Sequence, residues 1–412
     1  MGSKTLYICY FGVREALVQT QVIPYLREII KGGVEVSLLT FEPDFKLKWT
    51  QEQIATEKAN LSEKGINWYC LQYHKRPSAP ATAFDVMNGA WFVAKLLRLE
   101  KFDVIHCRVH IPMLMGAIAR KLSKHKPDLL FDIRGFFPEE YTDAGVWPEG
   151  GWLYRSAKRV ERWLLEEADG FVVLTEKARE ILFPESAETG FDEFGRPVEV
   201  IPCCVDLEKF KTANEWSRRE VQAELKIDKR KVLAYVGSFG GWYLTDEMLD
   251  FFATARESDL NTFILILTQR ETEKIRNALL ERGFAEGDFF VGSVTPGEIP
   301  RYLCAADVAI SFIKECYSKQ SSSPTKIAEY LACGVPVISN RGIGDIDDVI
   351  ERNGVGVMLH DFSTESYLSA LKRLEDLGNI GEKCRETAQR EFDLEKVGGE
   401  RYGRLYRKLL EN

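Results

Sequence analysis

Short apolar runs recur along the chain and alternate with longer segments in which apolar residues return at helical spacing. In the first half, apolar runs cover residues 6–11, 34–41, 129–133, 170–174 and 198–202, and a further strand begins at residues 103–106. In the second half, they cover residues 232–237, 262–267, 289–291, 308–312, 335–339 and 356–359. Strands that are buried on both faces read as continuous apolar runs, and intervening helices favour parallel pairing. The pattern therefore predicts an α/β chain with two open parallel sheets.

The two series of runs predict two domains. They meet around residues 203–230, so we expect one domain over residues 1–203 and a second over residues 204–385. The last segment, 386–412, carries apolar residues at helical spacing and predicts a terminal amphipathic helix. Ligands bind beyond the carboxyl ends of the strands in open parallel sheets. Two such sheets facing each other would hold two substrates across one cleft.

Composition narrows the function and the compartment. The chain has 412 residues and a formal net charge of −8, which argues against a general nucleic-acid binder. No apolar run approaches the ~20 residues that span a bilayer, and the N-terminus runs into a strand instead of a secretion signal. The nine cysteines are odd in number and scattered, which fits a reducing compartment. We therefore expect a cytoplasmic protein.

Two short stretches carry residue types that bind metal ions. The stretch from His106 to His110 holds two histidines and a cysteine, but the chain has only five histidines in all. Asp345 and Asp347 come after a glycine-rich turn and open a helix, where the helix dipole favours acidic side chains. We expect no metal site, and we favour a helix-start role for the two aspartates.

A basic amphipathic segment at residues 150–165 mixes aromatic residues with arginines and lysine. A helix of this kind can lie on an anionic membrane surface. The same pattern also fits a helix that packs on a sheet and keeps its charges in solvent. We favour packing, and the alternative is a peripheral contact with the inner face of the membrane.

The segment from Ser321 to Ser339 predicts a polar turn, a short helix, a glycine stop and a buried strand. Ser323 is expected to be the N-cap and Pro324 the first helical residue, because its missing N–H has no partner to lose there. A helix N-terminus favours an anion. The turn adds Lys326 and the hydroxyls of Ser322, Ser323 and Thr325, with Glu329 one turn further along. The segment thus predicts a phosphate and ribose cradle; the alternative is a solvated Lys326–Glu329 ion pair worth ~0.3 kcal/mol.

The same segment resembles the nucleotide-sugar motif of family-4 glycosyltransferases. These are retaining enzymes of the GT-B fold, with two facing Rossmann-like domains, an interdomain cleft and a terminal helix that crosses back onto the first domain. In the family, the motif is a Glu-x₇-Glu helix followed by a glycine and a Pro-Val strand. Glu329 matches the second glutamate, which binds the donor ribose, and Ser321 stands at the position of the first. The resemblance implies a subgroup with Ser-Ser-Pro-Thr-Lys-x-x-Glu.

Other segments extend the resemblance over nearly the whole chain. Gly12 and Val13 match the donor-phosphate loop of the family, although an ordinary strand-to-helix turn is the alternative. Gly237 and Ser238 follow the first strand of the second domain at the diphosphate position. The strand and loop that hold the nucleobase in the family correspond to Val291, Gly292, Ser293 and Val294.

The chain departs from the family at the diphosphate. Many members carry an arginine and, five residues later, a lysine, where this chain has Ser238 and Tyr243. The positive charge must then come from elsewhere, and Lys326 and Arg270 are the candidates. For Arg270, the alternative is a charge-mixed, solvated helix start.

A second departure lies in the first domain. Relatives often place a histidine near the reacting sugar, and Arg134 stands in that region here. Arg134 is therefore a candidate catalytic residue with Lys326; the alternative is an ion pair with Asp132 or Glu139. Arg108 and Glu139 are further candidates for the acceptor side, although Glu139 could equally be exposed.

The resemblance implies a hexosyltransferase that uses a nucleoside-diphosphate sugar, most simply a UDP-sugar. The acceptor would be a glycan or a lipid-linked glycan in polysaccharide or glycoconjugate biosynthesis. Such an enzyme needs no metal or other cofactor, because cationic side chains and a helix dipole stabilise the leaving diphosphate. The alternatives are a nucleotide-sugar 2-epimerase of the same fold and a non-catalytic protein that binds sugar nucleotides.

Overall fold

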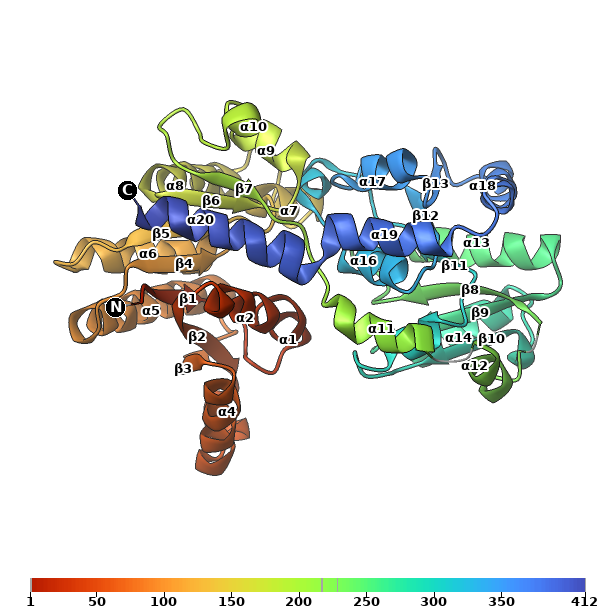
Figure 1. Cartoon of the computed structure of the whole chain (residues 1–412), viewed down its shortest axis with the longest axis horizontal. Coiled ribbons are helices and arrows are strands. Elements are labelled where there is room, and N and C mark those ends of the chain that lie inside the picture. The colour runs from red at the N-terminus through yellow and green to blue at the C-terminus, as the bar shows by residue number, and fades with distance from the viewer. Residues whose placement is uncertain (1, 216–217, 228, 412) are drawn as a thin grey trace. The chain divides into compact units, whose positions relative to one another are not determined.

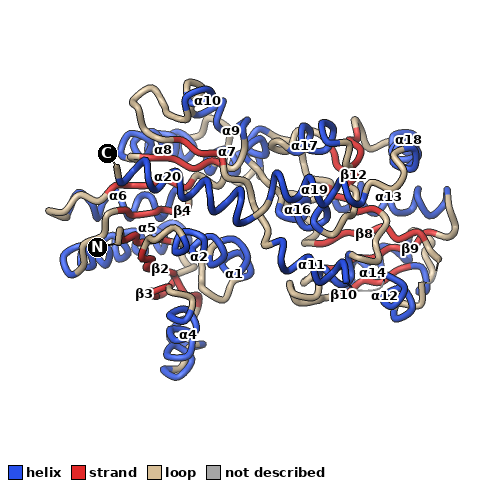
Figure 2. Tube along the Cα trace, viewed as in Figure 1, coloured by secondary structure: helices blue, strands red, loops and turns tan. Residues whose placement is uncertain are grey.

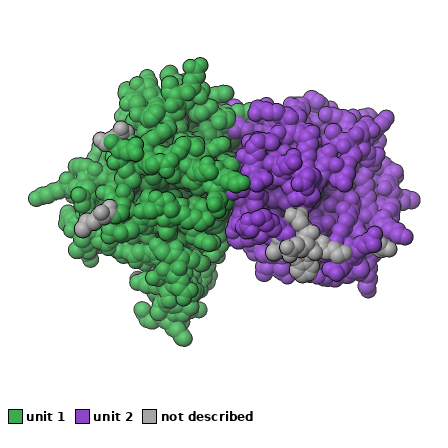
Figure 3. Space-filling model, in the orientation of Figure 1, with its two compact units in different colours: residues 1–202, 394–412 green, residues 203–393 purple. Residues whose placement is uncertain are grey.

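The computed structural model describes residues 2–215, 218–227 and 229–411. The chain divides into two compact units, coloured separately in Figure 3: residues 1–202 with 394–412, and residues 203–393. The second boundary lies eight residues beyond the predicted one, because α19 (Gly381–Phe392) packs against α16 (Thr325–Ala332) of unit 2. The terminal segment from Leu394 belongs to unit 1.

Unit 1 is built on a seven-stranded parallel sheet in the order β3-β2-β1-β4-β5-β6-β7 (Figure 1). Its strands are β1 (Lys4–Ile8), β2 (Glu35–Pro43), β3 (Ile66–Tyr73), β4 (Val104–Arg108), β5 (Asp128–Asp132), β6 (Gly170–Val173) and β7 (Val198–Val200). Most residues of β1 and β4–β7 are buried, as strands covered on both faces should be.

Helices cover both faces of this sheet. One face packs against α5 (Ser78–Leu99), α6 (His110–Leu122) and α8 (Trp152–Glu167), with Leu6 and Ile8 in that core. On the other face, Thr5 contacts Tyr406 of α20 (Glu400–Leu410), which lies beside β7 and α2 (Ile23–Lys31). The remaining elements are α1 (Ala16–Gln21), α3 (Phe45–Lys48), α4 (Gln51–Glu63), α7 (Phe137–Asp143), α9 (Glu176–Leu182), α10 (Ser186–Thr189) and a π-helical segment (Leu394–Gly399).

Unit 2 has a six-stranded parallel sheet in the order β10-β9-β8-β11-β12-β13. The strands, drawn red in Figure 2, are β8 (Lys231–Val236), β9 (Thr262–Leu267), β10 (Phe289–Gly292), β11 (Val308–Ser311), β12 (Val337–Asn340) and β13 (Gly356–Leu359). The other helices are α11 (Leu207–Glu215), α12 (Arg218–Glu224), α13 (Thr245–Ser258), α14 (Thr272–Glu281), α15 (Ile299–Leu303), α17 (Ile346–Asn353) and α18 (Thr364–Asp376), with 3₁₀ turns at Glu286–Asp288 and Tyr317–Ser321.

The predicted α/β class with two Rossmann-like parallel sheets is confirmed. One strand, β3, was not predicted: it is an edge strand whose later residues are only half-buried, so its sequence lacks a continuous apolar run. In α8, Glu161 and Leu164 are buried, whereas Trp152 is 70% exposed and Val160 40% exposed. Within the described ranges, none of the helices has the length and apolar character needed to cross a membrane.

Candidate active site

The strand order of unit 2 creates one topological switch point. β8 pairs with β9 on one side and with β11 on the other. The loop that starts at Gly237 leaves the carboxyl end of β8, and α16 follows β11. Ligands of open parallel sheets bind beyond the carboxyl ends of the strands at such a point. The predicted phosphate cradle therefore lies where the topology of unit 2 favours a ligand.

The start of α16 differs from the predicted capping. Pro324 is the N-cap, the helix begins at Thr325, and no side chain caps it. The Ser323 hydroxyl instead accepts a hydrogen bond of 3.0 Å from the N–H of Cys203. Ser321 is buried, and its hydroxyl donates to the carbonyl oxygen of Ser318 at 2.8 Å. The N-terminus of α16 thus keeps N–H groups that an anion can accept from, while the serines before it fix the turn.

Lys326 lies in an aromatic cage inside the switch point. Its side-chain nitrogen is 4.3 Å from the ring centre of Tyr235 and 3.9 Å from that of Tyr243. The nitrogen donates to the Tyr235 hydroxyl at 3.1 Å, and the residue is 8% exposed. Gly237 has φ 139° and no side chain; a Cβ there would lie 2.8 Å from the lysine nitrogen. The glycine therefore allows the lysine to approach the backbone after β8.

Burial controls the charges of Lys326 and Glu329. Removal from water lowers the pKa of Lys326 to about 7, although the nearby Glu329 acts in the opposite direction. Burial likewise raises the pKa of Glu329 to about 7, and Lys326 opposes that rise. Both groups are therefore close to their titration points at neutral pH. A solvated Lys326–Glu329 pair would show neither shift, so the structure does not fit that alternative.

The loop after β8 supplies aromatic rings where many family members supply cations. Tyr243 forms isolated bridges with Gly240 and with Ile313, which follows β11. The side-chain nitrogen of Lys319 lies 3.9 Å from the ring centre of Trp242, and Lys319 is 6% exposed. Sequence reasoning missed Lys319; its signal was a lysine directly before the serine-rich turn. Two buried lysines thus lie against one aromatic loop.

The predicted nucleobase residues lie at the carboxyl ends of β9 and β10. The Ser293 hydroxyl donates to the side-chain oxygen of Gln269 at 2.9 Å, and the Gln269 amide donates to the carbonyl oxygen of Val294. Val291 and Gly292 form the end of β10. Arg270 follows β9 with its residue exposed, which fits the solvated alternative better than a fixed phosphate contact.

The predicted phosphate loop of unit 1 already has anionic partners. The N–H of Gly12 donates to Glu15 at 3.0 Å, and the N–H of Val13 donates to Glu42 at 2.9 Å. Val13 is buried, and a Cβ at Gly12 would lie 2.8 Å from Pro43. A phosphate could reach these N–H groups only by displacing both carboxylates.

Arg134 belongs to a buried network. Its guanidinium is 2.7 Å from Asp132, and it donates to the Tyr402 hydroxyl at 2.5 Å. The Arg134 side chain is 5% exposed, and Arg108 is also buried, 3.8 Å from Asp132. Burial alone would raise the pKa of Asp132, but Arg134 and His106 hold it well below its usual range. This placement favours the ion-pair alternative for Arg134 and gives Arg108 the same internal role.

Glu139 is tied into a second buried network rather than exposed. It accepts from the Tyr154 hydroxyl at 3.0 Å, and its carboxylate is 3.0 Å from the nitrogen of Lys158. Lys158 also contacts Glu161, which is 3.0 Å from His110. These contacts join α7, α8 and the start of α6, and they leave Glu139 with partners inside unit 1.

Two stretches carry residue types that bind metal ions, and the structure places the aspartate pair at a helix start. Asp345 is the N-cap residue of α17, and Asp347 lies in its first turn, where its carboxylate also accepts from the N–H of Gly342 at 3.2 Å. In the part of the chain that the structure describes, no group of three or more His, Cys, Asp or Glu side chains could hold a metal ion.

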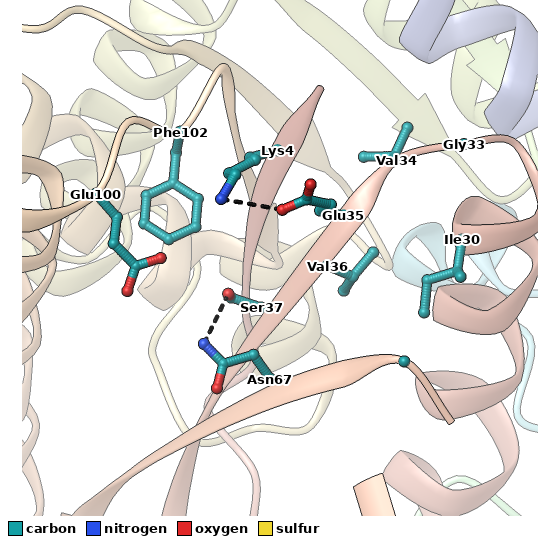
Figure 4. Close-up of a pocket in the computed structure, with 11 residues that line it drawn as sticks. Lys4, Ile30, Gly33, Val34, Glu35, Val36, Ser37, Asn67, Glu100 and Phe102 are labelled. Atoms are coloured by element: carbon teal, nitrogen blue, oxygen red, sulfur yellow. Dashed lines mark hydrogen bonds and ion pairs between the residues drawn. The ribbon is translucent and has the colours of Figure 1, made fainter. Parts of the chain in front are cut away.

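A hollow of about 420 Å³ lies in unit 1, away from the residues discussed so far (Figure 4). Lys4 and Glu35, 3.0 Å apart, and Ser37 and Asn67 lie along it. These residues start β1, β2 and β3, so the hollow is at the amino edge of the sheet. Because parallel sheets bind ligands at the opposite edge, we do not assign it to the active site.

The sequence matches two family models, one in each unit. Residues 18–187 match a glycosyl transferase 4-like domain, and residues 217–391 match glycosyl transferases group 1. Each unit therefore matches a glycosyltransferase domain, and the two Rossmann-like sheets agree with these matches.

Individual relatives agree with this class. A 2-deoxystreptamine glucosyltransferase of Streptomyces kanamyceticus is 26% identical over 221 residues, which span 53% of this chain and 54% of that protein. A glycosyltransferase of Rickettsia africae ESF-5 has a similar structure, with a TM-score of 0.70, 14% identity and coverage of 100% of this chain and 99% of the other. HepE of Anabaena, solved with UDP and glucose, gives a TM-score of 0.65, 14% identity and coverage of 98% and 100%.

Proposed function

We propose that this protein transfers a sugar from a nucleoside-diphosphate sugar, specifically a UDP-sugar, to a glycan or lipid-linked acceptor in polysaccharide or glycoconjugate biosynthesis. The observation that carries the proposal is Lys326, buried between two tyrosine rings at the switch point of unit 2. The choice of UDP is supported by HepE, which shares the fold and was solved with UDP and glucose. The glucosyltransferase from Streptomyces kanamyceticus supports a hexose as the transferred group.

The proposed reaction is retaining and independent of metal. The bond between the anomeric carbon and the diphosphate oxygen breaks, and the acceptor oxygen bonds to the same carbon on the same face. The proton of the acceptor hydroxyl passes to the departing phosphate oxygen. Lys326 and the N-terminus of α16 would stabilise the negative charge on the diphosphate, with Ser322 and Thr325 beside them. Glu329 would bind the donor ribose.

Binding and product analysis test this proposal. Calorimetric titration with UDP, GDP and ADP should show tightest binding for UDP, and Lys326→Met should weaken it at least tenfold. Lys372→Met, which changes an exposed lysine on α18, should bind UDP like the wild type. NMR of the product made from an α-linked UDP-sugar should show an α-linkage, with the rate unchanged by a chelator. Equal binding of all three nucleotides, or an epimer formed without acceptor, would contradict the proposal.

We place the protein in the cytosol, because its nine cysteines are odd in number and scattered along the chain, which fits a reducing compartment. A peripheral contact with an anionic membrane remains part of the proposal, through the exposed Trp152 and Val160 and the arginines of α8. Sedimentation with anionic vesicles at low salt tests this contact. A protein that stays in the supernatant with anionic vesicles just as it does in a parallel control with neutral ones would rule the contact out.

A further inference from the structure

A cluster of polar and aromatic residues lies at the carboxyl edge of the unit 1 sheet, and the chemistry above does not use it. Tyr10 follows β1, His74 follows β3, and Asp85 is on the second turn of α5. The Tyr10 hydroxyl donates to Asp85 at 2.7 Å. The His74 ring nitrogen Nδ1 lies 2.6 Å from the other oxygen of Asp85, and the His74 backbone N–H donates to Asp85 at 2.9 Å.

Asp85 fixes both the orientation and the protonation pattern of His74. Its side chain is fully buried and receives hydrogen bonds from three groups on two different loops. Because an ionised carboxylate only accepts, the neutral imidazole carries its proton on Nδ1 and presents Nε2 as an acceptor. The His74 side chain is 35% exposed, so this fixed acceptor can be reached from solvent.

An exposed aromatic ring completes the cluster. Phe84 is 58% exposed, and its ring meets the His74 ring edge-to-face with 5.1 Å between the ring centres. Met87, one turn further along α5, is 60% exposed. Exposed apolar surface that is rimmed by polar groups is typical of ligand-binding sites. Here they lie beside a hydrogen-bond acceptor that a buried carboxylate holds in place.

We propose that His74, Asp85 and Phe84 form a carbohydrate-binding subsite of unit 1, which holds the acceptor glycan. A sugar ring has an apolar C–H face, which fits the ring of Phe84, and hydroxyl groups that can donate to Nε2 of His74. Asp85 and Tyr10 act as positioning residues, because they hold the imidazole and do not reach the ligand. That the bound carbohydrate is the acceptor rests on the proposed function. That the site binds carbohydrate rests on the residues of unit 1 alone.

NMR of the histidine rings in the full-length protein tests the subsite. The chain has only five histidines, and the signal of His74 is identified by its loss in His74→Gln. The probes are the methyl glycosides of glucose, galactose, mannose and N-acetylglucosamine, each titrated to high millimolar concentration. At least one should shift the His74 signal in a saturable manner and leave the signal of His125 in place. A His74 signal that no glycoside moves would overturn the inference.

Matched variants separate binding from structure. Phe84→Ala should weaken the glycoside about threefold to tenfold, whereas Phe194→Ala, which removes a similarly exposed ring before β7, should not. His74→Gln should abolish saturation transfer to the glycoside, and His125→Gln, at the amino edge of the sheet, should keep it. The inference would also be overturned if Phe84→Ala and Phe194→Ala weakened glycoside binding equally. The same holds if His74→Gln and His125→Gln changed saturation transfer equally.

The outcome is independent of the donor site, because UDP binding by unit 2 is measured separately. If UDP binds and no glycoside moves His74, the subsite is wrong and the proposed function stands. If a glycoside binds and UDP does not, the proposed function fails and the carbohydrate site stands.

Discussion

The proposed binding of UDP should depend on pH in a defined direction, because Lys326 is buried. In the empty protein, burial lowers the pKa of Lys326 to about 7, so above neutral pH the lysine is mostly uncharged. A diphosphate favours the charged form, so binding must be accompanied by proton uptake. UDP itself gains no charge in this range, because its last phosphate ionisation lies near about pH 6. Affinity should therefore fall up to about tenfold per pH unit above pH 7.

The same shift sets the stability of the empty protein. The folded pKa is about 7 and the ordinary value is 10.5, so the unfolded chain binds more protons between these two values. The free energy of unfolding should thus rise with pH across that window, and the penalty for burying the lysine is complete below about pH 7. At about 1.4 kcal/mol per pKa unit, the shift from 10.5 to about 7 corresponds to a burial penalty of at most about 5 kcal/mol. Lys326→Met should therefore stabilise the protein at neutral pH by about 1–4 kcal/mol while it weakens UDP binding.

Calorimetry in two buffers of different ionisation enthalpy measures the proton uptake directly. At about pH 8, the wild type should take up close to one proton per UDP, and Lys326→Met should take up none. The groups that face Lys326 and could mimic this behaviour are Glu329, Tyr235 and Tyr243, and the pKa values of both tyrosines are raised away from this range by burial. Glu329→Gln removes a charge that favours the protonated lysine, so the loss of affinity should begin at lower pH. A wild-type affinity that is flat between about pH 7.5 and 9, or a Lys326→Met variant with the wild-type slope, would refute the reasoning.

Three further substitutions test the aromatic cage of Lys326 and the buried network of Arg134. Tyr243→Leu removes one of the rings that hold Lys326 and should weaken UDP binding about threefold by calorimetry, with the melting temperature little changed. Gly237→Ala places a Cβ 2.8 Å from the lysine nitrogen at φ 139°, and thermal unfolding should show a loss of about 1–3 kcal/mol; an unchanged melting temperature would contradict the close approach. Arg134→Met leaves Asp132 buried without its main partner and should lower the free energy of urea unfolding by about 3–5 kcal/mol, while Asp132→Asn in the same chain restores part of it. A surface role for Arg134 would predict little change in urea.

The sheets could be predicted from sequence because most of their strands are buried on both faces. The runs around Leu233, Ile264 and Ile338 are mostly apolar, and each forms a strand inside the sheet rather than at its edge. β3 was not predicted because an edge strand need not be apolar on both faces. Its segment from Ile66 to Tyr73 mixes the polar residues Asn67 and Gln72 with aromatic residues. The amphipathic periodicity of the last helix was equally clear, and four of its residues are buried in α20.

The site could be predicted only where a motif fixes the local backbone. The glycine, proline and hydroxyl pattern located the N-terminus of α16, but Ser323 bonds to Cys203 rather than capping the helix, and that contact spans 120 residues. Arg134 shows the same limit. From the local sequence, a basic residue after a strand is expected to be exposed and available to a ligand. Its partner Tyr402 lies 268 residues away in the terminal helix, so the sequence around Arg134 gives no sign of the contact. Local sequence does not reveal which long-range partner a charged side chain will find.

The two buried lysines, Lys319 and Lys326, explain why the loop after β8 carries aromatic rings in place of cations. The position where family members carry lysine is Tyr243, and its ring holds Lys326; the neighbouring Trp242 holds Lys319. Permanent cations in this loop would repel the two lysines and would lower the pKa of Lys326 further. Aromatic rings instead attract ammonium groups and tolerate the neutral form. At the proposed donor site, the departure from the family motif therefore keeps a source of positive charge, but makes that charge conditional on the anion that binds there.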